Sequence, residues 1–130
     1  MCGAYCVTFE GKVYGFGENI CQLLDFNKNI DNKSYVLIQQ LCHKNIEEFF
    51  GNERVFFARS ETNVIYCWGW NYCARLGRGF KCDDFHKSAK NELLSDKNLR
   101  QISCGFRQCF ALSLTHERKG KPILMSEYTV

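Results

Sequence analysis

Two observations in the sequence predict an all-β fold made of repeated units. The segment GKVYGFGENICQLL, at Gly11–Leu24, returns 52 positions later as NVIYCWGWNYCARL at Asn63–Leu76. A second segment, IEEFFGNERVFFA at Ile46–Ala58, returns in a looser form as QISCGFRQCFAL at Gln101–Leu112. A spacing of about 50 residues is typical of repeat architectures, in which one unit cannot bury its apolar face alone. We therefore expect a series of similar β units.

Each copy of the first segment opens with a residue suited to a left-handed backbone. Gly11 and Asn63 occupy this place. Glycine adopts positive φ without a Cβ penalty, and asparagine is the commonest substitute for it. The pair predicts a tight hairpin turn at the same point of both units.

The residues after each turn are strong strand formers. A glycine follows each aromatic run, Gly17 in the first copy and Gly69 in the second, which predicts a bulge or the close approach of another backbone. The matched positions are Val13 and Ile65, Tyr14 and Tyr66, Phe16 and Trp68, Gly17 and Gly69, Asn19 and Asn71, Cys21 and Cys73, and Leu24 and Leu76.

The second segment supplies the strands that precede the aromatic run. Alignment of Gly51 with Gly105, a spacing of 54, also matches Phe50 with Cys104, Val55 with Cys109, Phe56 with Phe110 and Phe57 with Ala111. Two extended runs followed by a hairpin into the aromatic strand give three or four short strands per unit. That is the content of one propeller blade. The predicted fold is a partial β-propeller of about two and a half blades with three to four antiparallel strands each.

The units divide the chain into three parts. Residues 1–44 form an N-terminally incomplete first repeat with its connector, and residues 45–98 form a complete second repeat with its connector. Residues 99–130 form an incomplete third repeat with a divergent tail, in which only Gly120 is available as a hairpin glycine. In the first connector, Asp25–Lys44, a short helix and a strand both fit YVLIQQL. The second connector, Gly79–Asn98, is predicted to be a surface loop.

The repeated residues resemble the regulator of chromosome condensation repeat. Its blades read roughly as Cys-Gly, Ala-Leu, a hairpin glycine, Val-Tyr, Trp-Gly, Asn and Gly-Gln-Leu-Gly. This chain departs from the pattern at Leu24-Asp25 and at Ala74-Arg75, which weakens the turn after each aromatic strand. The residues that carry the resemblance are Gly11, Val13, Tyr14, Phe16, Gly17, Asn19 and Gln22–Leu24 in the first unit, Ile65, Tyr66, Trp68, Gly69, Asn71, Leu76 and Gly77 in the second, and Cys104, Gly105, Ala111 and Leu112 in the third.

Within that family, the linker LCHKNIEEFFG and the following VFFARSETN are most similar to proteins that join such a propeller to a BTB domain. The resemblance favours a strand over a helix for YVLIQQL in the first connector. It also implies a seven-bladed ring, which the units of this chain cannot close alone. We expect a fragment of a longer product or a truncated gene model, in preference to a chain that assembles with copies or other propeller pieces. Further blades or a BTB domain are the partners expected in a longer product.

Charge and hydropathy exclude several classes of function. The chain has 17 basic and 14 acidic residues and a net charge of +3, too mild a balance to predict direct binding to nucleic acid. No apolar run approaches the roughly 20 residues that span a bilayer. The start, MCGAYCVTFEGK, lacks the features of a signal peptide. We expect no membrane association and an intracellular location in the cytoplasm, the nucleus or both.

The sequence predicts no catalytic, cofactor or metal site. Nine cysteines are present but no CxxC pair, so structural thiols are favoured over redox targets and over a zinc site. The three histidines, His43, His86 and His116, lie in predicted connectors or the tail, where no rigid strand would aim a general base.

Two functions follow from the family resemblance. The first is a non-catalytic protein–protein interaction module, a partner or substrate receptor whose BTB domain would connect it to a ubiquitin ligase. Its protein partner is unknown. The alternative is guanine nucleotide exchange on a Ran-type small GTPase with chromatin association, although no residue of this chain matches the exchange loops. A third and weaker interpretation, an enzyme or a metal protein, is based on the thiols alone.

Overall fold

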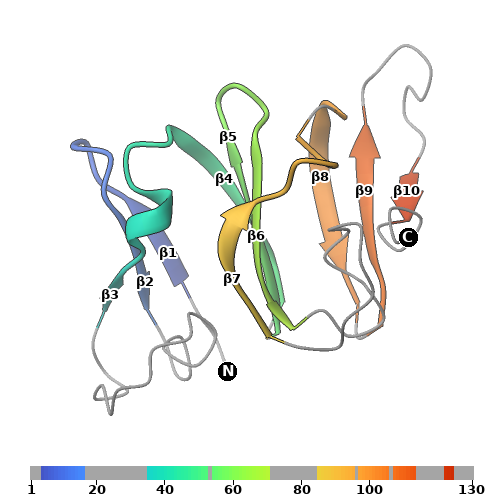
Figure 1. Cartoon of the computed structure of the whole chain (residues 1–130), viewed down its shortest axis with the longest axis horizontal. Helices are drawn as coiled ribbons and strands as arrows, with labels where there is room; N and C mark the ends of the chain where they lie inside the picture. The colour runs from blue at the N-terminus through green and yellow to red at the C-terminus, as the bar shows by residue number, and fades with distance from the viewer. Residues whose placement is uncertain are drawn as a thin grey trace.

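The protein folds as three antiparallel β-sheets that stand side by side, a partial propeller-like arrangement (Figure 1). The computed structural model describes residues 4–16, 35–52, 54–70, 85–95, 97–105, 107–113 and 122–124. These residues hold ten strands and one 3-10 helix, η1 (Gln39–Leu41). The predicted all-β class is therefore confirmed.

Each sheet is a simple meander. The first contains β1 (Ala4–Val7), β2 (Val13–Phe16) and β3 (Val36–Leu37) in that order. The second contains β4 (Ile46–Gly51), β5 (Val55–Ser60), β6 (Ile65–Trp70) and β7 (Phe85–Lys90). The third contains β8 (Leu99–Cys104), β9 (Cys109–Ser113) and β10 (Pro122–Leu124).

The two connectors differ from each other in how well their sequences predict them. In the first connector the family resemblance favours a strand over a helix. The structure has the short strand β3 there, followed by the 3-10 helix η1 over Gln39–Leu41. The prediction of a loop over the whole second connector is wrong, because Phe85–Lys90 forms β7. This segment, FHKSAK, has little apolar alternation, and it becomes a strand by pairing with β6. Tertiary pairing here overrides a weak local signal.

The sequence repeat with a spacing of 52 residues is also a repeat in the pairing of strands. Ala4 pairs with Phe16 in the first sheet as Phe56 pairs with Trp68 in the second. The predicted hairpin turns are confirmed, since Gly11 has φ 81° and Asn63 has φ 63°. In each turn the amide of this residue donates to the carbonyl three positions earlier, at 2.9 Å in the first sheet and 3.0 Å in the second.

The 54-residue alignment of the second segment is wrong by one residue. Gly51 pairs with Phe56 as Cys104 pairs with Cys109, so the spacing is 53. Gly105 is therefore the counterpart of Asn52, not of Gly51. No glycine is needed at position 52, because the side chain of Asn52 stabilises this turn. Its Oδ1 accepts hydrogen bonds from the backbone amides of residues 54 and 55, at 2.8 and 3.2 Å. A slip of one residue assigns every side chain of a strand to the opposite face.

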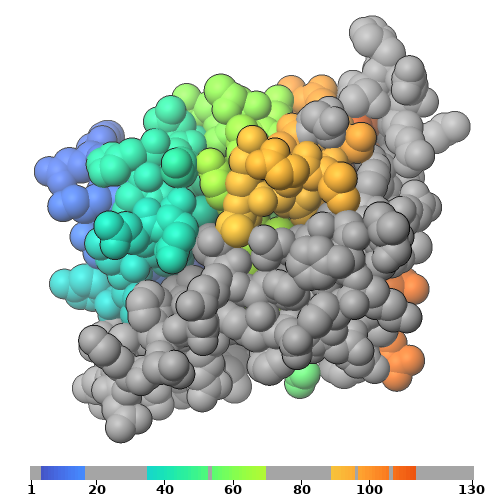
Figure 2. Space-filling view, in the orientation of Figure 1, coloured from blue at the N-terminus to red at the C-terminus, as the bar shows by residue number. Residues whose placement is uncertain are grey.

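A third sequence repeat lies in the turns that lead from one sheet to the next. LCHKNI at 41–46 returns as LSDKNL at 94–99, again 53 positions later. Asn45 and Asn98 both have positive φ, 53° and 50°. Cys42 Sγ accepts a hydrogen bond from the amide of Val13, as Ser95 Oγ does from Ile65. Figure 2 shows these two turn segments on the same face of the molecule.

The second sheet is buried on both faces, and this burial creates two cores. Every residue of β5 is buried. Alternate residues of a strand point to opposite faces, so Val55 and Phe57 pack toward the third sheet while Phe56 and Ala58 pack toward the first. The core between the second and third sheets also contains Ile65, Cys67, Leu94, Leu99, Ile102, Cys109 and Ala111. The core between the first and second sheets also contains Val13, Val36, Ile38, Leu41, Ile46 and Trp68.

Candidate interaction surfaces

The outer face of the first sheet, which points away from the second sheet, carries an exposed aromatic cluster. Tyr35 packs on Tyr14 with ring centroids 5.5 Å apart and on Phe16 at 5.8 Å. Tyr35 is 64% exposed and Phe16 38% exposed. Strand pairing assigns the members of this face, which are Ala4, Cys6, Tyr14, Phe16, Tyr35 and Leu37.

The same positions of the second sheet are covered. Trp68, the counterpart of Phe16, is 0% exposed and lies 5.7 Å from the ring of Tyr5 in the first sheet. Phe56, the counterpart of Ala4, stacks on Trp68 and meets the edge of Tyr5. Burial in this core raises the pKa of the Tyr5 hydroxyl. The outer face of the first sheet therefore carries the same kinds of side chains as the equivalent face of the second sheet, which is buried against the first sheet.

One edge of the first sheet has no partner strand among the described residues. In the second sheet, β5 is flanked by β4 on one side and β6 on the other. Its counterpart β1 is flanked only by β2 in the part of the chain that the structure describes. We call the opposite side of β1 the free edge.

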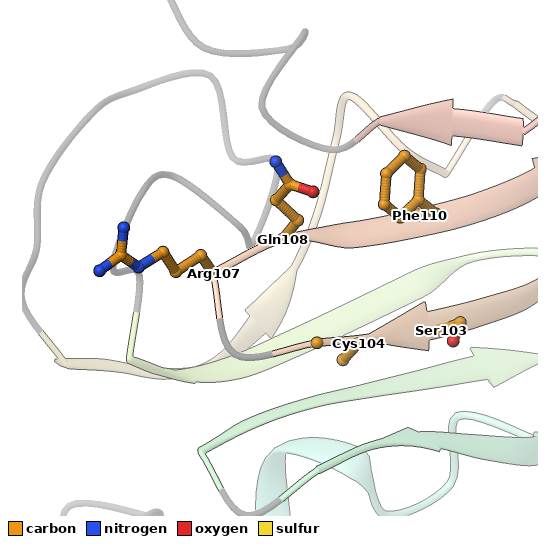
Figure 3. A pocket seen from close by; sticks show the side chains of 6 residues that line it. Ser103, Cys104, Arg107, Gln108 and Phe110 are labelled. Carbon is orange, nitrogen blue, oxygen red and sulfur yellow. The ribbon is translucent and has the colours of Figure 1, made fainter.

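A shallow hollow lies at the turn between β8 and β9 (Figure 3). Its volume is about 610 Å³. Figure 3 shows Gln108 and Phe110 on the β9 side of the hollow, Ser103 and Cys104 on β8, and Arg107 in the turn between them. The described residues that line it include a thiol and a hydroxyl but no histidine or carboxylate to activate them, so this lining suits binding rather than nucleophilic catalysis. These residues are Ser103, Cys104, Gly105, Arg107, Gln108 and Phe110.

A buried arginine joins β4 to β5. The guanidinium of Arg59 contacts Glu47 Oε2 at 3.0 Å and also Glu48 Oε2. The ladder between the two strands is irregular at Ile46–Glu48, where two residues of β4 lie opposite one of β5, so both carboxylates reach the same cation. Paired charges compensate the desolvation of the guanidinium. Val7 occupies the corresponding place in the first sheet, so no such cation exists there.

The predicted repeat positions are distributed over turns and cores and do not gather into one site. Gly69 lies at the predicted bulge, between Cys67 and Gly69 in the pairing of β6 with β7. Gly51 and Gly69 both have positive φ and close backbone neighbours. Five predicted positions lie outside the described residues, Gly17, Asn19, Asn71, Leu76 and Gly77. The others form turns (Gly11, Asn63, Gly105), strand positions in or beside the cores (Gly51, Tyr66, Trp68, Gly69, Cys104, Ala111, Leu112) or the outer face (Tyr14, Phe16).

Two residues of the outer face, Tyr35 and Leu37, were missed by reasoning from the repeats, because they lie in a connector. Their signal in the sequence is the apolar run YVLI beside the aromatic strand.

The described cysteines are Cys6, Cys42, Cys67, Cys104 and Cys109, and two of them, Cys67 and Cys109, are buried. The described residues contain no group of three or more His, Cys, Asp or Glu side chains placed to hold a metal ion. Across the same residues, no helix has the length and hydropathy needed to cross a membrane. Cys21, Cys73, His116 and the side chain of His86 lie outside the description.

No protein-family model matches the chain. The chain is 24% identical over 112 residues to the serine/threonine-protein kinase Nek9 of Xenopus laevis, a match that covers 85% of this chain and 12% of that kinase. This chain therefore spans about an eighth of the length of that relative.

A solved structure shares the fold. The crystal structure of human WBSCR16 matches 85% of this chain and 28% of its own, with a TM-score of 0.65 and 18% sequence identity. This likeness shows that the chain shares the fold of that structure over most of its length.

Proposed function

We propose that this chain is a non-catalytic protein–protein interaction module, a part of a propeller that acts as a partner or substrate receptor. The observation that carries the proposal is the outer face of the first sheet. Its aromatic cluster of Tyr14, Phe16 and Tyr35 stands on a sheet whose other face is packed in a core. The side chains are therefore held by a rigid scaffold while their apolar surface meets solvent.

Two general properties of interfaces support this proposal. Contiguous apolar patches on a protein surface mark binding sites more often than isolated apolar residues do. Tyrosine and other aromatic residues are enriched at binding hot spots, where they bury a large area and lose few rotatable bonds. Partner binding on this face would bury the kind of surface that the second sheet buries at Trp68.

A BTB domain in a longer product would give the module its ubiquitin-ligase context. The support for this part of the proposal is the similarity of the linker at 41–51 and of the strand that follows it to BTB-associated propellers. The kinase activity in the name of the Xenopus relative gives no support for an activity of this chain, because the match covers 12% of that protein. For guanine nucleotide exchange, no observation on the described residues speaks in its favour.

Site-specific cross-linking tests the proposal. We expect a photoreactive residue at Tyr35 of the full chain to capture a defined protein in cells, and we expect the purified partner to bind Phe16→Ser at least about tenfold more weakly. Phe9→Ser is the matched control, because Phe9 is exposed in the turn between β1 and β2, outside the outer face. Equal affinities of the partner for wild type, Phe16→Ser and Tyr35→Ser would contradict the proposed function.

A further inference from the structure

We propose that Cys104 and Cys109 form a site of reversible oxidation, in which a hydroperoxide joins the two thiols in a disulfide beside the turn between β8 and β9. The inference goes beyond the proposed function and does not depend on it, because both cysteines lie in the third sheet and the outer face belongs to the first. It follows from the pairing of β8 with β9, which places the two cysteines directly opposite each other.

The register of this hairpin determines how closely the two cysteines approach. Cys104 is the last residue of β8, Cys109 is the first residue of β9, and the two are Cα partners. The next pair toward the turn is hydrogen-bonded, because the amide of Gly105 donates to the carbonyl of Gln108 at 2.7 Å. Hydrogen-bonded and non-hydrogen-bonded pairs alternate along an antiparallel ladder. Cys104 and Cys109 therefore form a non-hydrogen-bonded pair.

A non-hydrogen-bonded pair has the spacing that a disulfide needs. Its Cα atoms lie about 4.5 Å apart, and its side chains are closer than those of a hydrogen-bonded pair. Disulfides join residues whose Cα atoms are about 4.4–6.8 Å apart and whose Cβ atoms point toward each other. Directly paired residues share one face of a sheet, and Cys104 packs against the core that contains Cys109. The bond can therefore form while β8 and β9 stay paired.

Among the described cysteines, no other two lie opposite each other in paired strands. Cys6 pairs with a tyrosine, Cys67 pairs with a phenylalanine and an alanine, and Cys42 follows η1 outside the strands. In the second sheet, the positions equivalent to 104 and 109 hold Gly51 and Phe56. The paired thiols are therefore a property of the third sheet and are not required by the repeat.

The two thiols differ in exposure, and this difference assigns their roles. Cys104 is half-buried and lines the hollow at the end of β8, whereas Cys109 is 0% exposed (Figure 3). A peroxide molecule would therefore reach Cys104 first. Redox-sensitive cysteines are accessible thiols that often stand beside a second cysteine, which resolves the oxidised one. Cys109 is placed to be that resolving cysteine.

The oxidation takes two steps. Cys104 Sγ, as the thiolate, attacks one oxygen of the hydroperoxide, the O–O bond breaks, and the products are the sulfenic acid of Cys104 and an alcohol, or water from hydrogen peroxide itself. Cys109 Sγ then attacks the sulfur of Cys104, the S–O bond breaks, and water leaves as the S–S bond forms. The two thiols lose two electrons and two protons, and the peroxide gains them.

The disulfide would act on a turn that contacts the neighbouring sheet. Asn52 Nδ2 in the second sheet donates to the carbonyl of Gly105 at 3.1 Å. Oxidation would fix the backbone on which Arg107 and Gln108 line the hollow. The loop that the bond closes is short, and the entropic stabilisation from a disulfide falls as the closed loop shortens. We therefore expect a dithiol reductant to reverse the oxidation.

Peptide mapping of the full chain after brief treatment with hydrogen peroxide tests the inference. Trypsin cleaves after Arg100, Arg107 and Arg118, which places Cys104 in QISCGFR and Cys109 in QCFALSLTHER. With the remaining thiols alkylated before digestion, we expect these two peptides to be linked, with their summed mass less two hydrogen atoms. This linkage should be at least about tenfold more abundant than any other within the chain, and dithiothreitol should separate it.

Two variants test the roles of the thiols. In Cys109→Ala the reaction should stop at the sulfenic acid of Cys104, which dimedone would label at least about tenfold more strongly than in the wild type. Cys42→Ser is the matched control, because Cys42 is also half-buried and its counterpart Ser95 makes the equivalent hydrogen bond. We expect this control to change the yield of the linked peptides less than about twofold. Circular dichroism checks that both variants fold.

Absence of the linked peptides from the oxidised wild-type chain would overturn the inference. Linkage of Cys109 to the tryptic peptide 60–75, which contains Cys67, in place of Cys104 would also overturn it, and so would equal dimedone labelling of the wild type and Cys109→Ala. These measurements need no binding partner, so failure of the oxidation site is distinguishable from failure of the proposed function.

Discussion

Replacement of Gly69 by alanine is expected to destabilise the protein by about 3 kcal/mol or more. Gly69 has φ 112°, a conformation that L-residues rarely adopt. A Cβ at this position would lie 2.9 Å from Val55 Cα and would collide with the carbonyl oxygen of Arg54. Both obstacles are backbone atoms at the start of β5, one in its first residue and one in the residue before it, so relief requires the middle sheet to distort.

Gly105→Ala is the matched control. Among the described residues, a Cβ at Gly105 would meet only the carbonyl oxygen of Gln108, at 3.5 Å, an ordinary contact distance. We expect this variant to change the free energy of unfolding by less than about 1 kcal/mol. Denaturant unfolding monitored by tryptophan fluorescence measures both variants, and equal stability of the two would refute the crowding at Gly69.

Replacement of Trp68 by alanine is expected to cost about 3–5 kcal/mol of unfolding free energy. Trp68 is fully buried between the first and second sheets, where it stacks on Phe56 with ring centroids 5.7 Å apart. Its repeat counterpart Phe16 lies on the outer face. We expect Phe16→Ala to cost less than about 1 kcal/mol, because a partly exposed ring loses little burial.

Thermal or denaturant unfolding of these two variants, followed by circular dichroism, compares one repeat position in two environments. A cost for Phe16→Ala as large as that for Trp68→Ala would mean that the outer face is covered, and would contradict its assignment as an interaction surface.

Local backbone requirements were the most predictable part of the fold. Gly11 and Asn63 belong to the few residue types that accept positive φ, so the hairpin turn leaves a mark in the residues themselves. The alternation of aromatic and small residues after each turn marks β2 and β6 in the same way. These signals depend on neighbours along the chain and need no knowledge of the other sheets.

Features set by pairing between strands were less predictable. Strand β7 has a polar sequence and is a strand because β6 offers it an edge. The spacing of 54 failed because glycine was taken as the fixed point of the alignment, whereas Asn52 performs the turn role of Gly105 with its side chain.

The candidate interaction surface was the least predictable part, for a physical reason. Phe16 and Trp68 occupy equivalent positions and have similar chemistry, yet one is exposed and the other is buried. The first sheet packs against Trp68, whereas no described sheet packs against Phe16. This difference arises from tertiary packing and cannot be recognised from the chemistry of either residue.

Amide hydrogen exchange at single-residue resolution on the full chain is the most direct test of the central claim, that the second sheet is the buried middle layer between the first and third sheets. Tyr5 and Val7 in β1 should exchange at least about a hundredfold faster than their counterparts Phe57 and Arg59 in β5. Strand β5 lies between β4 and β6 in a sheet packed on both faces, whereas in the described part of the chain β1 is flanked by β2 alone. Equal protection of the two pairs would contradict the account.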